Sequence, residues 1–596
     1  MAVQLFLNDT EVITDSTQEI RITRENPYVT LSDSYTLDVS LPLDILQNRR
    51  FFGNLQRIDT TKQYREFACR LLCNNALLME GTARIVQSTD LVVKVQLACG
   101  VSALKLSSEQ EGMYIDQLLT DPPAKGLTSK DYMDYVNVRG TGDRGYGAIL
   151  KDSTSGMVVN MKMAYYAAGA LRMGFPLVSE CPRLLDVARL IAGKLGYSVD
   201  MSCLPPACGS IYVMSAAQGC VGRKLPHWTV KEFMAEFQNF FGATFVRSGD
   251  RSLRLVPLDS YAANPVTEIE PVAEFQVEYT EEDAAEGIIN RNVEFDMESS
   301  DLEVVDEEVL AQAKSEGVYT DEGAMRNAFR TDTDSVRMRK LYRLNGETYI
   351  GWEIPGENEG DPSTYELRRV APFNPLRRFE GAESVSLRIA PAYMEEDVEC
   401  VMSYNLDTLL ARANDYKVRL TIPSVSSPYG LRPFYEAGDS AGDDDTATLQ
   451  ELVEGVEAVA SGDERPDTMS VAFIDGRTES VVAKNEYIDS EVAYRAHLAF
   501  TDYNFKKQLA NNRSRWSLSL NPLPGCEFYL GQLHRISFTC SHKVKHIVKF
   551  VSPSIPEPTD IFLIRGKRFA CEKIEASVRD GRLDPLMTGY FYEFLS

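Results

Sequence analysis

Two segments of the chain, residues 181–199 and 227–245, carry the same pattern of apolar residues. When Gly196 is aligned with Gly242, the apolar positions of both segments recur at i, i+3, i+4, i+7 and i+11. This spacing puts them on one stripe of a helix, so it predicts two helices that each bury one face. The matching residues are Leu184, Val187, Ala188, Ile191 and Leu195 in the first segment and Val230, Phe233, Met234, Phe237 and Phe241 in the second.

Both predicted helices end at their aligned glycine, which suits a left-handed C-terminal position, and each continues into a short alternating strand. Thr229 and Glu232 have the spacing of a capping box at the start of the second helix. After the second glycine, Ser248–Arg251 is expected to turn Thr244–Arg247 back into Leu253–Val256 as a hairpin. The segments therefore predict two consecutive helix–glycine–strand units.

The charge of the chain limits the partners that it can bind. With 62 basic and 87 acidic residues, the formal net charge is −25. A nucleic-acid-binding surface needs clustered Lys and Arg, so this balance argues against one. It remains compatible with a surface past which DNA slides without sticking. The 596 residues correspond to roughly four domains.

Cysteine usage and hydropathy indicate where the chain is made. No apolar run reaches the roughly 18 residues of a membrane-spanning helix, so we expect no such span. The first residues lack the basic and apolar regions of a secretory signal. The 11 cysteines are scattered, and many lie in alternating strand patterns. We therefore expect free thiols in a protein made in a reducing cytosol.

Period-two alternation dominates the rest of the chain and predicts an α+β, mainly β fold. In residues 1–100, series such as Phe67, Cys69 and Leu71 indicate an antiparallel sheet or small barrel. Near the other end, Arg565-Gly566-Lys567 is a hairpin signal, and the aromatic segment 589–595 is expected to be docked. Helices are also expected near 110–119, in part of 158–171, near 306–314 and at 449–459.

Composition shifts suggest five regions along the chain. Residues 267–308 are strongly acidic, with Arg291 as their one basic residue, and 436–445 have the composition of an exposed linker. The predicted regions are a first tube-like β-barrel domain at 1–100, an α+β domain with the two units at 101–260, a second barrel-like domain with the acidic segment at 261–435, an acidic linker or insertion at 436–468, and a β-rich domain at 469–596.

Several short strings match motifs of chemistry-bearing sites, but their contexts do not fit. Gly140-x-Gly142-x-x-Gly145 has the dinucleotide-binding spacing, yet no helix opens after it. Gly438-x-Ser440-x-Gly442 matches a nucleophile elbow but lies in the acidic linker. The aspartates of 439–445 do not follow the spacing of a calcium-binding loop. We therefore expect no nucleotide, nucleophile or calcium site here.

The histidines and cysteines offer weak candidates for metal binding. In a regular strand, Cys540, His542 and His546 would share one face, but a structural zinc site usually has four ligands. A second weak set is Cys203, Cys208 and Cys220. His227 lies at the entry to the second predicted helix, where packing or capping is the expected role. We therefore assign no metal, cofactor or catalytic residue.

The two units together resemble a known family. Leu184–Gly196 and Val230–Gly242 are similar to the helical units of the central hub proteins of phage tails. That family includes late-control, baseplate-hub and tail-associated proteins and the related spike base of type VI secretion and other contractile injection systems. Its first unit ends in a Leu-Gly step, like Leu195-Gly196. Its second resembles Trp228–Phe233, followed by a strand hairpin like Phe245–Val256.

The resemblance extends to the opening strands, where Gly81-Thr82-Ala83 before Leu91–Gly100 is similar to the first tube-like barrel of the hub. It covers about residues 1–260. Beyond residue 260 there is a general likeness to tail proteins, including the hairpin at Phe562–Val578 and the aromatic end. The chain is longer than a minimal hub, which suggests additional domains.

The resemblance implies a homotrimer in which each subunit supplies two barrels, giving six around an axis that matches a hexameric tail tube. It implies a location at the distal tip or baseplate of a virion tail, assembled in the bacterial host cytoplasm. The expected neighbours are the tail tube or distal tail protein, the tape measure protein and tip, spike or fibre proteins, with DNA present only in transit. A negative lumen would repel DNA phosphates. Its candidate residues are Glu268, Glu270, Glu274, Glu278, Glu281, Glu282 and Asp283.

Two alternative functions remain open at this point. The chain could be a glycan-binding adhesin of the tail, because aromatic rings stack on sugars. Its candidate residues are Tyr590, Phe591, Tyr592, Trp352 and Trp516, for which core packing is the competing interpretation. A tail-borne cell-wall hydrolase is the third hypothesis, and the lack of a recognisable catalytic motif argues against it.

Overall fold

The computed structural model describes residues 3–15, 18–30, 33, 35–36, 38–53, 55, 66–100, 102, 113–119, 147–167, 170–174, 177–218, 220–249, 251–279, 292–296, 302–303, 314–319, 321–331, 340–344, 347–354, 364–370, 384–403, 415–426, 467–485, 489–503, 514–522 and 525–595. Strands dominate these residues, which confirms the predicted α+β, mainly β class. None of their helices is long and apolar enough to cross a membrane.

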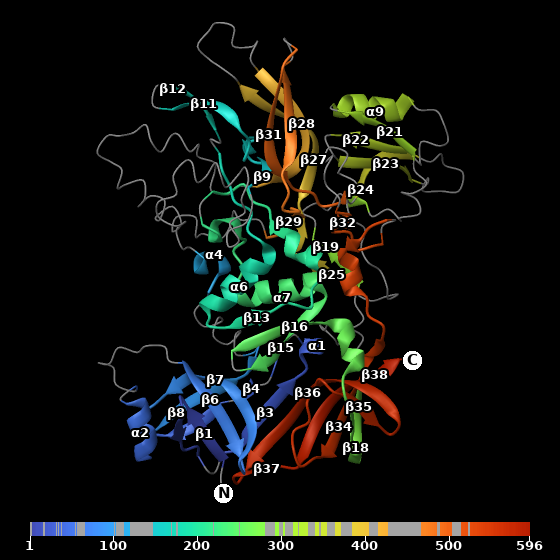
Figure 1. Ribbon diagram of the computed structural model, residues 1–596. Coiled ribbons are helices and arrows are strands. Elements are labelled where there is room, and N and C mark those ends of the chain that lie inside the picture. The colour runs from blue at the N-terminus through green and yellow to red at the C-terminus, as the bar shows by residue number, and fades with distance from the viewer. Residues whose placement is uncertain are drawn as a thin grey trace.

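Strands from both ends of the chain, together with β17 and β18 from its middle, build one 15-stranded sheet at the bottom of Figure 1. Its main path runs β18-β34-β38-β36-β3-β4-β8-β7-β6-β1-β2. The strands are β1 (Val3–Leu7), β2 (Thr10–Val12), β3 (Ile20–Glu25), β4 (Tyr35–Thr36), β5 (Val39–Pro42), β6 (Glu66–Cys73), β7 (Ala76–Ser88), β8 (Val92–Ala98), β17 (Val266–Glu268), β18 (Pro271–Tyr279), β34 (Thr539–Val551), β35 (Ile561–Ile564), β36 (Lys567–Arg579), β37 (Arg582–Leu583) and β38 (Leu586–Leu595).

One strand pairing in this sheet joins segments from the two ends of the chain. β3 lies antiparallel to β36, with Ile20 opposite Val578 and Glu25 opposite Lys573. Asn26 extends the contact, because its Nδ2 donates to the Cys571 carbonyl at 2.7 Å. Side chains from both ends share one buried cluster, which includes Leu5, Leu71, Val95, Phe550, Ile574 and Phe591. The predicted boundaries of the first and last regions stay a prediction, but their strands lie in one sheet.

The middle of the molecule is an α/β layer. It contains α4 (Ile115–Leu118), α6 (Leu184–Lys194), α7 (Val230–Phe241) and the three-stranded sheet β13-β16-β15, formed by β13 (Ser198–Asp200), β15 (Ala243–Gly249) and β16 (Ser252–Pro257). Beside it lie β14 (Ile211–Val213), β29 (Met469–Phe473) and β26 (Ile389–Pro391), then β19 (Asn292–Phe295) with β25 (Ser384–Leu387), and β32 (Trp516–Ser517) with β33 (Phe528–Tyr529). Figure 1 shows this layer between the large sheet and the upper strands.

The upper part contains a small closed barrel of four strands. β9 (Ala148–Asp152) pairs with β31 (Glu491–Leu498), β31 with β30 (Glu479–Asn485), β30 with β28 (Asp415–Val425), and β28 returns to β9. β27 (Tyr393–Ser403) and β10 (Val158–Val159) add to its sides. Of the four barrel strands, only β28 lies within the range 261–435 that was predicted to hold a second barrel.

Two smaller pieces flank the barrel in Figure 1. One is the hairpin of β11 (Met163–Ala167) and β12 (Ala170–Gly174). The other is a five-stranded sheet with α9 (Glu322–Thr331), in the order β20 (Leu302–Glu303), β24 (Thr364–Val370), β23 (Glu347–Ile354), β22 (Lys340–Leu344) and β21 (Lys314–Tyr319). Short helical turns elsewhere are α1 (Pro27–Thr30) and α2 (Leu46–Phe52).

One helix prediction is wrong. Residues 158–171 were expected to be partly helical, yet the chain there forms β10, β11 and the start of β12. The alanines favour a helix locally, but cross-strand pairing from Met163 opposite Gly174 to Ala167 opposite Ala170 sets the backbone. Within the predicted helix at 110–119, residues 115–118 are helical. The predicted helix at 449–459 lies outside the described residues, as does nearly all of the one near 306–314.

Candidate functional site

The two helix–glycine–strand units form a single α/β element at the centre of the molecule. α6 leads into β13 and α7 leads into β15, which confirms the helices and strands predicted from the repeated pattern. β15 and β16 form the predicted hairpin, with Phe245 opposite Leu255. β13 then adds parallel to β16, with Val199 opposite Leu253. The second unit therefore supplies the two strands on which the first unit docks.

The apolar stripes of both helices face one core. In α6, Leu184, Val187 and Ile191 are fully buried, and Leu195 is partly buried against the same core. In α7, the five residues of the stripe have exposed fractions of 0 to 1%: Val230, Phe233, Met234, Phe237 and Phe241. Burying a large apolar side chain contributes roughly 1.5–3 kcal/mol each, so these stripes are the main attachment of both helices.

The start of α7 has the predicted capping box. The Thr229 Oγ1 accepts from the Glu232 N–H at 3.2 Å, and the Glu232 Oε2 accepts from the Thr229 N–H at 2.8 Å. α6 begins without a side-chain cap. The two units therefore repeat their apolar spacing but differ in how their first turns are stabilised.

The two glycines end their helices under different constraints. Gly196 has φ +77°, and the next N–H, from Tyr197, donates back to the Ala192 carbonyl at 2.9 Å. Gly242 has φ +54°, and a Cβ placed there would lie 2.6 Å from the Leu533 carbonyl oxygen. Gly242 is therefore required both by its left-handed backbone and by the close approach of a distant segment.

A buried amide ties α7 to its strand. Gln238 is fully buried, and its Oε1 accepts from the Phe245 N–H at 2.8 Å and lies 3.1 Å from the Thr244 hydroxyl oxygen. Its Nε2 donates to the Met234 carbonyl at 3.1 Å. These contacts join the last turns of α7 to the first residues of β15.

The second unit also contacts the large sheet. The Thr244 hydroxyl lies 2.7 Å from the carbonyl oxygen of Pro27 in α1, and Arg247 Nη1 donates to the Glu80 carbonyl in β7 at 2.6 Å. The Nε2 of His534 is 3.1 Å from the Phe240 carbonyl oxygen at the end of α7. The α/β element thus contacts α1 and β7 near the start of the chain and a helical turn at Leu530–His534 in its C-terminal part.

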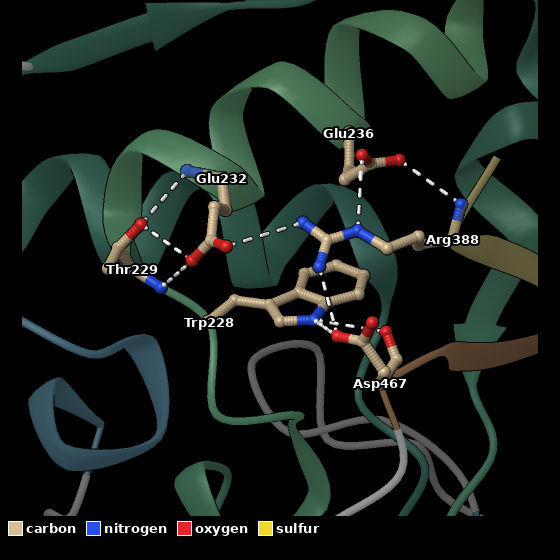
Figure 2. Close-up of polar contacts among 6 residues, drawn as sticks. All are labelled: Trp228, Thr229, Glu232, Glu236, Arg388 and Asp467. Atoms are coloured by element: carbon tan, nitrogen blue, oxygen red, sulfur yellow. Dashed lines mark hydrogen bonds and ion pairs between the residues drawn. The ribbon is translucent and has the colours of Figure 1, made fainter. Parts of the chain in front are cut away.

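Figure 2 shows a polar cluster around Arg388, which includes Glu232 and Glu236 of α7. The guanidinium lies over the Trp228 ring, 4.6 Å from its centroid. It contacts the carboxylates of Glu236 at 3.3 Å, Asp467 at 2.9 Å and Glu232 at 3.7 Å. The indole N–H of Trp228 donates to the Asp467 carbonyl at 3.1 Å and lies 3.2 Å from its carboxylate.

This cluster connects three segments that are far apart in sequence. Arg388 stands between β25 and β26, its N–H donates to Glu236 at 3.1 Å, and its carbonyl accepts from the N–H of Met469 in β29. Burial alone would lower the pKa of the Arg388 guanidinium, but the surrounding carboxylates outweigh it and raise that pKa. The cation therefore holds α7 against the β14-β29-β26 sheet.

The entry to α7 carries a histidine–aspartate pair. His227 Nδ1 lies 3.1 Å from Asp116 Oδ2, and its ring stacks on Tyr114. Backbone bonds run beside this pair, from Ile115 N–H to the Trp228 carbonyl and from Val230 N–H to the Met113 carbonyl. His227 thus connects α4 to the start of α7, in line with the packing role expected for it.

Lys224 is a buried cation that no sequence pattern indicates. It is 7% exposed, and its ammonium donates to the Glu180 carbonyl and lies 3.5 Å from the Ser179 hydroxyl oxygen. Burial lowers the pKa of Lys224. Arg388, Gln238 and Lys224 have no recognisable local pattern, because their partners are set by the tertiary fold.

The candidate lumen residues are only partly described. Glu268 and Glu270 are exposed on β17 and the turn after it, and Glu278 on β18 is half-buried. The negative charge of Glu278 contributes to a raised pKa of Tyr590 and Tyr592, after the larger effect of burial. The side chain of Glu274 and all of Glu281, Glu282 and Asp283 lie outside the described residues.

Among the described residues, the candidate metal ligands Cys540 and His546 do not lie in one cluster. Cys540 is buried with Tyr261 and Tyr592, whereas the His546 ring contacts Phe569 in a different cluster. A register irregularity between Cys540 and Lys545 in β34 separates them, and the side chain of His542 is not described. No group of three potential ligands was found among the described residues.

The aromatic candidates for sugar stacking are engaged within the protein. Phe591 is fully buried, Tyr592 donates to Glu572 at 2.7 Å, and Trp516 lies 5.6 Å from the Phe473 ring. Tyr590 donates to Glu575 at 3.3 Å. The side chain of Trp352, the glycine-rich string at 140–145 and the aspartates of 439–445 lie outside the described residues.

Solved structures similar to this chain include two tail proteins. No protein-family model matches the chain, and no curated protein matches it. The chain is similar to a 43 kDa tail protein of prophage MuSo2 from Shewanella oneidensis, at 8% identity and a TM-score of 0.29, over 99% of this chain and 96% of that one. It is also similar to a tail protein from Neisseria meningitidis MC58, at 9% identity and a TM-score of 0.29, with the same coverage.

Proposed function

We propose that this protein is a non-enzymatic structural component of a phage tail, acting as the central hub at its distal end. The observation that carries the proposal is the α/β element formed by the two helix–glycine–strand units. It has the local structure expected from the resemblance to tail hub proteins, and it contacts the large sheet below and the β14-β29-β26 sheet beside α7.

The proposed function follows from the mechanical role of this α/β element, which connects two sheets. Buried apolar stripes, the Gln238 amide and the Arg388 cluster fix α6 and α7 relative to the strands around them. A rigid element of this kind transmits load between β units without needing a ligand. In the proposed assembly, three copies form a ring that joins the tail tube to the tip or spike, beside the tape measure and fibre proteins.

The acidic segment supplies the second part of the proposal. In a ring of three copies, the carboxylates of Glu268, Glu270 and Glu278 face the central channel and repel DNA phosphates during passage. The residues of the segment beyond Tyr279 add further negative charge in the sequence. The net charge of −25 is in keeping with a channel that DNA crosses without adhering.

Cryo-electron microscopy of the purified full chain, alone and mixed with its tail tube protein, tests this function. We expect rings with threefold symmetry in which β17 and β18 lie nearer the central axis than β1 and β2. Rings that place Glu268 and Glu270 on the outer surface contradict the channel, and particles without threefold symmetry in both samples contradict the hub. An array of bacterial surface glycans tests the adhesin alternative in parallel.

A further inference from the structure

The large sheet ends at β2 on one side and β18 on the other, and the β2 edge is capped by side chains. Asn48 of α2 accepts from the Ile13 N–H at 2.9 Å and donates to the Ile13 carbonyl at 2.7 Å, just beyond β2. Gln47 donates to the carbonyl of Glu11 within β2. These amides make the bonds that an added strand would make, so β2 is protected against strand addition.

The opposite edge has no comparable cap among the described residues. β18 is nine residues long and pairs with β34 on one side, and no described strand pairs with its other side. Val272 is 42% exposed and Tyr279 is 80% exposed. The stretch that pairs regularly with β34, from Phe275 to Tyr279, offers a row of backbone N–H and C=O groups to an incoming segment, whereas the register is irregular between Pro271 and Phe275.

The charge of β18 and its flanks selects among possible occupants. Residues 267–283 contain seven carboxylates and no Lys or Arg: Glu268, Glu270, Glu274, Glu278, Glu281, Glu282 and Asp283. Two copies of β18 placed side by side would set carboxylates against carboxylates, which is unfavourable across a strand pair. A strand that carries Lys or Arg would instead meet carboxylates of opposite charge, and Glu268, Glu270 and Glu278 are those whose side chains are described.

We propose that the outer edge of β18 binds an extended, cationic segment of a partner protein as an additional strand. Main-chain hydrogen bonds to β18 supply the affinity, and Lys or Arg side chains at alternating positions supply the selectivity. The main path of the 15-stranded sheet then grows at its β18 end, because the side-chain amides of Gln47 and Asn48 in α2 block its β2 end.

This inference goes beyond the hub function and does not depend on it. Side chains of a strand point to the two faces of the sheet, whereas its edge consists of backbone groups in the sheet plane. A bound strand therefore extends the sheet beside β18, and its Lys or Arg side chains lie next to carboxylates that project on the same face. The two claims can fail separately, because strand binding is measured on the chain in any oligomeric state.

The test uses the full chain and a labelled nine-residue peptide that alternates lysine with valine, with a glutamate–valine peptide as its matched control. We expect the lysine peptide alone to bind in fluorescence anisotropy, and its affinity to fall about tenfold between 0.05 and 0.5 M NaCl. In hydrogen–deuterium exchange, the lysine peptide should protect the amides of β18 and leave those of β2 unchanged.

Adjacent proline variants test whether the backbone edge is the binding site. In an antiparallel strand, neighbouring N–H groups point to opposite sides, so Gln276→Pro and Val277→Pro remove one outward and one inward donor. We expect one of them to abolish peptide binding with the β34 side of the strand still protected from exchange. Glu270→Lys, which leaves the backbone intact, should weaken binding of the lysine peptide several-fold.

Four results would each overturn the proposal. These are no binding of the lysine peptide, equal binding of the glutamate peptide, unchanged binding in both proline variants, and protection that appears at β2 rather than at β18. Self-association of the chain through β18, detected as an oligomer that the lysine peptide dissociates, would assign the edge to a second copy and also overturn it.

Discussion

Gly242 meets two demands that no residue with a Cβ can meet together. Its φ of +54° costs other residues roughly 1–2 kcal/mol, and a Cβ would lie 2.6 Å from the Leu533 carbonyl oxygen. At Gly196, which has φ +77°, the nearest atom to such a Cβ is Nη1 of the Arg251 side chain, at 3.1 Å. A flexible side chain can move away, whereas the backbone of Leu533 cannot.

We therefore predict that Gly242→Ala is the more damaging of two chemically identical substitutions. Gly196→Ala should cost about 1–2 kcal/mol from its backbone alone. Gly242→Ala should cost about 2–4 kcal/mol, because overpacking adds to the same backbone strain. Local hydrogen–deuterium exchange of residues 184–200 and 230–258 measures both effects. Equal losses of protection would show that the Leu533 contact does not constrain the second glycine.

His497 gives a pH-dependent prediction at the same scale. The ring is 1% exposed, its Nδ1 lies 3.1 Å from the Arg477 carbonyl oxygen, and burial lowers the pKa of His497. As the pH falls through about 6.5, His497 therefore takes up a proton in the unfolded chain before it does so in the folded chain. The contribution of His497 to stability is present above that pH and is lost below it.

We expect the melting temperature of the wild type to fall more steeply between pH 7 and pH 5 than that of His497→Asn. Asparagine keeps a donor near the position of Nδ1 but does not titrate. Differential scanning fluorimetry at matched ionic strength measures the two slopes. Parallel slopes would mean that His497 takes up its proton equally well in both states.

At the scale of elements, Arg388 joins α7 to the strands on either side of its own position. Arg388→Met keeps most of the apolar stem over Trp228 but leaves the carboxylates of Glu236 and Asp467 without their cation. Because the cluster is partly exposed, we predict a loss of about 1–3 kcal/mol, below the range for a fully buried pair. Exchange of residues 384–391 and 467–473 should rise, and Arg388→Lys should give a smaller rise.

The elements also show what the sequence could and could not predict. α6, α7 and the hairpin of β35 with β36 depend on residues a few positions apart, so their spacing was sufficient. The helix predicted in part of residues 158–171 is wrong because pairing between β11 and β12 sets an extended backbone conformation there. The Arg388 cluster could not be predicted, since Trp228 and Asp467 reach it from different parts of the chain.

At the scale of the molecule, the large sheet is built from both ends of the chain. No local pattern indicates that β3 pairs with β36, because the two strands are separated by most of the sequence. This pairing bears on the predicted domain at 1–100, whose strands share a core with Phe550, Ile574 and Phe591. A fragment limited to that range would expose this core.

We predict that a fragment of residues 1–100 does not fold alone and that co-expression with residues 530–596 restores it. Circular dichroism and proton NMR dispersion of the fragment measure this directly. The matched control is the same pair with Ile574→Asp, which should prevent rescue by placing a charge in the shared core. A cooperatively folded fragment 1–100 would establish it as an independent domain.

Assembly into a ring of three copies underlies the hub, its channel and its match to a tail tube. Mass photometry of the purified full chain over a range of concentrations measures this assembly most directly. The hub function predicts a species with three times the mass of the 66.7 kDa chain, growing with concentration at the expense of the monomer. A single 66.7 kDa species at every concentration, with and without the tail tube protein, would contradict it.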